Sequence, residues 1–134
     1  MTWTTTDGVG HPFLHLAHAS ARSKLSVAAA KAIEDADRLL VSAITPWEIA
    51  IKAKKGKLEL DRPIREWMRL ALSHWKVELL PLDLEVSIRS VEVRELLNRD
   101  PADCIIVATA LHYGLPIVTR DAAMARFPRI RVIW

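Results

Sequence analysis

The sequence has little of what stabilises small secreted proteins or membrane-spanning ones. It holds a single cysteine, Cys104, among 134 residues, so no disulfide can form within the chain. The longest apolar run, Cys104–Leu111, is interrupted by Thr109 and is far shorter than the roughly 18 residues of a membrane span. The first ten residues lack the basic and apolar regions of a signal peptide. These features predict a cytoplasmic protein with a buried thiol.

Glycine is also scarce. The four glycines are scattered, which excludes a glycine-rich phosphate-binding loop. No serine nucleophile elbow or cysteine–histidine pair is present, and the apolar surroundings of Cys104 disfavour a thiolate. His11, His15 and His18 have helical spacing but no acid among them, so we interpret them as a partly exposed helix face rather than a zinc site.

What the sequence does contain suits one α/β domain. A chain that is 51% hydrophobic and 26% charged is typical of globular proteins. Short apolar runs predict strands at Leu39–Ala43, Val77–Leu82, Pro116–Thr119 and Arg131–Trp134. Periodic apolar residues predict helices at Ser26–Asp35, Ile64–Trp75, Leu84–Leu97 and Asp103–Tyr113. We therefore expect residues 1–134 to form a single three-layer α/β/α domain with a mostly parallel central sheet.

Positive charge gathers in the middle of the chain. The net charge is +3, and residues 45–76 hold eight basic side chains against four acids. Such a cluster suits a polyanionic partner, although a solvated helix face explains the charge equally simply and is the commoner case. The basic residues expected to contact a substrate backbone are Lys52, Lys55 and Arg120.

Three acids occupy positions where they can simply cap helices. In Thr45–Glu48 (TPWE) the threonine suits an N-cap, the proline the first helical position and Glu48 the third, as in a capping box. The segment Asp100–Asp103 (DPAD) repeats this pattern with Asp103. Asp121 follows a predicted strand and can cap a short helix. With this interpretation none of the three acids needs a catalytic role.

The expected topology favours a second interpretation, in which the same acids converge. Glu48 and Asp121 each follow a strand, and Asp103 opens the helix that leads back to the strand before Asp121. Open parallel sheets bind ligands beyond the carboxyl ends of their strands. Divalent cations such as Mg²⁺ take carboxylate ligands and assist phosphodiester cleavage. The sequence thus predicts a metal site, with Trp47 the nearest of the tryptophans.

Two segments carry a resemblance to a known family. Residues 41–60 (VSAITPWEIAIKAKKGKLEL) and 99–124 (RDPADCIIVATALHYGLPIVTRDAAM) resemble the PIN-domain nucleases, in particular the VapC-type toxins of type II toxin–antitoxin pairs. The resemblance runs from about His11 to Trp134. It implies an Mg²⁺- or Mn²⁺-dependent endoribonuclease that dimerises and is inhibited by an antitoxin. The metal ligands that it implies are Glu48, Asp103 and Asp121. The expected supporting residues are Asp100, Thr119 and Thr45.

The beginning of the chain departs from the family's pattern. Members begin with an apolar strand that ends in a metal-binding Asp, followed by Thr or Ser and a helix. Here His11–Leu14 matches the start of that helix, which places Val9 where the Asp belongs. Asp7 is the nearest acid that could substitute. The joint loss of strand and Asp suggests a shifted reading frame or altered start. It also gives an alternative function: a PIN-like domain that binds an antitoxin or RNA with impaired catalysis.

Overall fold

The strands of the described residues form a four-stranded sheet of mixed direction and a two-stranded parallel sheet beside it. The computed structural model describes residues 2–4, 13–14, 26–97, 100–119 and 121–134. One sheet has the order β1 (Thr2–Thr4), β2 (Phe13–Leu14), β5 (Ile117–Val118) and β6 (Val132–Ile133), and β1 also pairs with β5. The β2–β5 and β5–β6 pairs are parallel, whereas β1 is antiparallel to both of its partners. A second parallel pair, β3 (Leu39–Ser42) and β4 (Val77–Leu80), contacts β1 and β2 through β3.

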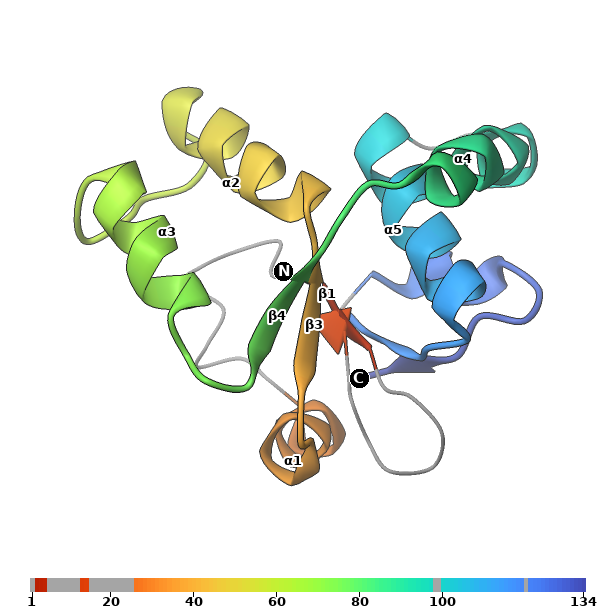
Figure 1. Ribbon diagram of the computed structural model, residues 1–134, viewed down its shortest axis with the longest axis horizontal. Helices are drawn as coiled ribbons and strands as arrows, with labels where there is room; N and C mark the ends of the chain where they lie inside the picture. Colours follow the sequence, from red (N-terminus) through yellow and green to blue (C-terminus); the bar gives the residue numbers. More distant parts are fainter. Residues whose placement is uncertain (1, 5–12, 15–25, 98–99, 120) are drawn as a thin grey trace.

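Helices cover both sides of these strands (Figure 1). Helices α2 (Ile44–Lys54) and α3 (Ile64–Leu72) lie on one side, and α4 (Leu84–Leu97) and α5 (Pro101–Tyr113) lie on the other. Helix α1 (Val27–Asp35) lies beside the start of β3. The predicted α/β class, with helices on both sides of a mostly parallel sheet, is confirmed. No helix in the described parts of the chain is long and apolar enough to cross a membrane.

The start of the chain differs from the prediction. The segment Phe13–Leu14, expected at the beginning of a helix, forms strand β2 and pairs in parallel with β5. Pairing with a buried strand satisfies the backbone groups of this apolar dipeptide, which explains why a strand is formed. Asp7, Val9 and the three histidines at 11, 15 and 18 lie outside the described residues.

Helix α5 forms the centre of the core, and its ends are fixed by side-chain and backbone chemistry. Asp100 is its N-cap and accepts a 2.9 Å hydrogen bond from the Asp103 N–H through Oδ1. At the other end Gly114 has φ +65°, a left-handed conformation that favours glycine. Between these ends the helix buries apolar side chains, Ile106 and Val107 among them, against α4 and the sheet. The predicted N-cap of this helix, Asp100, is confirmed.

Candidate active site

Helix α2 begins earlier than the sequence predicts, and this removes the capping explanation for Glu48. The N-cap is Ala43, which makes no side-chain cap, and the Ser42 hydroxyl accepts a hydrogen bond from the Ile44 N–H. Thr45 is therefore the second helical residue rather than the N-cap, and Glu48 is the fifth rather than the third. The predicted capping box is wrong here, because a side chain that far along the helix cannot reach the N-cap amide.

The Glu48 side chain is instead buried with an unsatisfied carboxylate. The residue is 9% exposed, and its Oε1 has no hydrogen-bond partner among the described residues. Burial above all, and then the nearby negative charge of Asp103, raise the pKa of Glu48 from 4.5 to about 7. An orphaned carboxylate oxygen in such a place is costly, so Glu48 is a candidate ligand for a cation.

Asp103 reaches the same place from α5. It is 6% exposed and is held at the first turn of α5, where its backbone N–H is bonded to the Asp100 side chain. Helices α2 and α5 contact one another although Glu48 and Asp103 are far apart in sequence. Two carboxylates brought together in this way repel each other unless a proton or a cation lies between them. The pair is therefore suited to hold a divalent cation.

Asp121 follows β5 and opens a short 3-10 helix, η2 (Ala122–Arg126). Its Oδ1 accepts a 3.0 Å hydrogen bond from the Ala123 N–H, as predicted for an N-cap. Its own N–H donates to the buried hydroxyl of Thr119 at 3.1 Å. Thr119 thus fixes the backbone that presents the Asp121 carboxylate.

The structure brings two of the three acids, Glu48 and Asp103, within electrostatic range of each other. Among the described residues, no group of three Asp, Glu, His or Cys side chains lies close enough to hold a metal ion. Glu48 and Asp103 act on one another electrostatically, but Asp121 is not gathered into that pair. The participation of Asp121 stays a prediction, and Asp7 and Arg120 lie outside the described residues.

A basic stripe runs from the acid pair along α2. Successive residues of a helix are rotated by about 100°, so Glu48, Lys52 and Lys55 share one face. Lys52 is close enough to Glu48 for its positive charge to oppose the rise in the Glu48 pKa. Lys55 is exposed one turn further on. This face therefore offers cations for phosphate groups that enter beside the acids.

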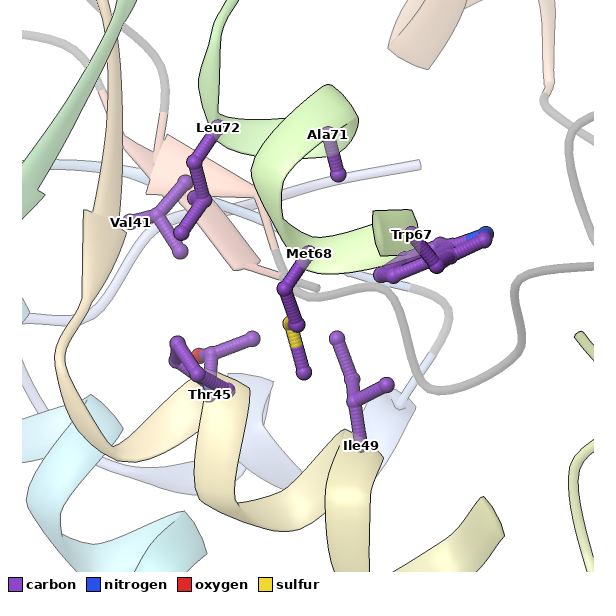
Figure 2. A pocket seen from close by; sticks show the side chains of 8 residues that line it. Val41, Thr45, Ile49, Trp67, Met68, Ala71 and Leu72 are labelled. Atoms are coloured by element: carbon purple, nitrogen blue, oxygen red, sulfur yellow. The ribbon is translucent and has the colours of Figure 1, made fainter. Parts of the chain in front are cut away.

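An apolar cavity lies between β3, α2 and α3 (Figure 2), and neither Glu48 nor Asp103 lines it. Its volume is about 10 Å³, about the least space that one water molecule requires. The lining side chains come from β3, α2 and α3: Val41, Thr45, Pro46, Ile49, Trp67, Met68, Ala71 and Leu72. Thr45, the one hydroxyl among them, has no hydrogen-bond partner among the described residues. The cavity is a packing gap between helices, and it contains none of the candidate ligands.

Comparison with known proteins gives a family and a relative for this chain. Residues 13–130 match the PIN domain family. The chain is also 34% identical over 113 residues to Ribonuclease VapC22 of Mycobacterium tuberculosis, a match that covers 83% of this chain and 85% of the relative. No solved structure gives a significant match.

Proposed function

This chain belongs to the PIN-domain family, and from that premise we propose that it is an Mg²⁺- or Mn²⁺-dependent endoribonuclease, the toxin of a type II toxin–antitoxin pair. One observation carries the proposal. Glu48 has a buried carboxylate oxygen without a partner, and Asp103 is close enough to raise its pKa. A purely structural acid is usually paired or capped, whereas a metal ligand keeps an oxygen available for the cation, as Glu48 does with Oε1. The similarity to a ribonuclease supports RNA as the substrate.

The proposed roles follow from the positions of the side chains. Glu48 and Asp103 hold the cation, and Asp121 completes the site from the end of β5. When bound, the cation supplies charge stabilisation at the scissile phosphate and makes a bound water more acidic. Asp100 and Thr119 position Asp103 and Asp121 through backbone hydrogen bonds. The phosphates on either side of the scissile bond contact Lys52, Lys55 and Arg120.

The resemblance also supplies the proposed partners. An antitoxin binds the protein and blocks cleavage, two copies of the chain form a homodimer, and the pair acts in the cytoplasm. Residues 1–134 act as one PIN-like domain.

Cleavage of RNA by the purified chain tests the proposal. With Mg²⁺ or Mn²⁺, the wild-type protein is expected to cut RNA, and Asp103→Asn to cut at least about 100-fold more slowly, because the cation loses a charged ligand. Asp37→Asn is the matched control. Asp37 is exposed just before β3, at the opposite end of that strand from α2, and its loss should change the rate less than about twofold.

Equal cleavage by wild type and Asp103→Asn would contradict the role of Asp103. The second candidate function, a domain that binds without cutting, is favoured by Val9 at the position of the family's first Asp. It predicts an inactive wild-type protein whose cleavage is restored by Val9→Asp. Cleavage by the wild type at rates that Val9→Asp does not increase would count against it.

A further inference from the structure

We propose that Trp47 stacks against one unpaired base of a single-stranded RNA and so places the neighbouring phosphate at Glu48 and Asp103. The proposal rests on the proposed function, since it takes RNA as the substrate. It adds a residue that binds the base rather than the metal or the phosphate. It also implies that the enzyme prefers single-stranded segments, whose bases are free to stack.

Exposure and position single out this side chain. Trp47 is 57% exposed, although its neighbours Glu48 and Ile49 are buried. It precedes Glu48 directly, so its indole projects about 100° around α2 from the face of Glu48, Lys52 and Lys55. A base on the indole would thus lie beside the acids, with the adjoining phosphates along the lysines. Aromatic side chains beside basic grooves bind unpaired bases in this way.

The surroundings of Trp47 favour RNA over a protein partner. Within α2, Trp47 is the one large apolar side chain that is strongly exposed. The same face continues with the exposed Ala50 and Lys54. Large contiguous apolar patches mark many protein interfaces, and one indole beside Ala50 and Lys54 does not form such a patch. One flat aromatic ring with cations nearby is sufficient for a base and its phosphates.

A second exposed tryptophan supplies a matched control. Trp75 is 80% exposed, but it lies before β4, at the end of that strand remote from α2. Backbone hydrogen bonds join Leu39 to Lys76 at one end of β3 and Ala43 to Leu80 at the other. The Trp75 ring already stacks on His74 with centroids 5.9 Å apart. Trp75 therefore has comparable exposure without the acids beside it.

The test measures RNA binding without cleavage. A fluorescein-labelled single-stranded RNA is titrated in EDTA with the wild type, Trp47→Ala, Trp47→Phe and Trp75→Ala, and anisotropy gives the affinity. The same RNA is then prepared with one abasic nucleotide at each position in turn. A duplex of the same sequence serves as a substrate without free bases.

We expect Trp47→Ala to weaken binding of the single strand about tenfold or more, and Trp47→Phe to retain most of the affinity. Trp75→Ala should stay within about twofold of the wild type. One abasic position should weaken wild-type binding and leave Trp47→Ala unaffected, since the base and the indole lose the same contact. Duplex binding should not distinguish the variants.

Three results would overturn the proposal. The first is no RNA binding by the wild type, and the second is unchanged single-strand binding by Trp47→Ala. The third is weaker binding by Trp47→Ala when no abasic position weakens binding by the wild type. Loss of dimerisation by Trp47→Ala with intact RNA binding would assign the indole to a protein contact instead. If the wild type cleaves RNA but Trp47→Ala binds it equally well, stacking is refuted and the nuclease function stands. If the abasic effect depends on Trp47 but the protein never cleaves RNA, stacking stands and the nuclease function is refuted.

Discussion

Asp121→Asn is expected to lower RNA cleavage by about 100-fold or more while changing the free energy of unfolding by less than about 0.5 kcal/mol. Cleavage falls while stability is kept, because Asn caps a helix as well as Asp does. The variant keeps the acceptor for the Ala123 N–H and the bond from its own N–H to Thr119. What it loses is the negative charge, which a divalent cation requires.

Asp121→Ala is the companion variant, because it removes the cap and the charge together. It should lose activity to the same extent and also unfold about 1 kcal/mol more easily in urea. Initial rates on a labelled RNA and urea midpoints measure both quantities. If Asp121→Asn cleaves at the wild-type rate while Asp121→Ala is destabilised, Asp121 is a helix cap and the acid site lacks it.

Glu48→Gln is expected to stabilise the metal-free protein at alkaline pH. The pKa of Glu48 is raised from 4.5 to about 7 by burial and by Asp103, so the folded state binds a proton that the unfolded state releases between these values. The free energy of unfolding of the wild type should therefore fall as pH rises from 4.5 through 7. The loss is about 3 kcal/mol at most.

Glu48→Gln removes this fall in stability with rising pH, because glutamine does not ionise. At pH 8 without metal it should be more stable than the wild type by about 1–3 kcal/mol, and at pH 4.5 the two should agree within about 0.5 kcal/mol. Glu92→Gln, an exposed glutamate of α4, serves as the matched control and should show no such pH dependence. Urea unfolding at both pH values measures the difference.

Adding Mg²⁺ at pH 8 should make the wild type more stable than Glu48→Gln. A ligand that binds only the folded protein raises the melting temperature of the wild type by mass action, whereas Glu48→Gln has lost a ligand and gains little. If both proteins gain equally from Mg²⁺, the cation binds elsewhere. If the wild type is no less stable at pH 8 than at pH 4.5, the Glu48 carboxylate is not buried as described.

Local chemistry explains which elements could be predicted. The prediction for the DPAD segment is confirmed, because Asp100 has the side chain of an N-cap and Pro101 suits the first position. The prediction for the TPWE segment is wrong. The first four N–H groups of any helix are unpaired, so Pro46, which has no N–H, is tolerated at the third position. The helix start was decided by Ser42, which lies outside the motif.

Long-range contacts were beyond prediction from the residues alone. Two apolar residues, Phe13 and Leu14, show no periodicity, and only pairing with β5 makes them a strand. Similarly, nothing in the local sequence of Glu48 indicates that Asp103 raises its pKa. The family resemblance predicts that these acids form one site. Only the structure shows that Glu48 is buried and that its Oε1 has no hydrogen-bond partner among the described residues.

Crystals soaked in Mn²⁺ provide the most direct measurement of the metal site, because anomalous scattering locates the ion independently of activity. We predict an anomalous peak within direct bonding distance of the carboxylates of Glu48 and Asp103, with Asp121 drawn toward it. The absence of a peak there, at a Mn²⁺ concentration that supports RNA cleavage in solution, would contradict the proposal that these acids hold the catalytic metal.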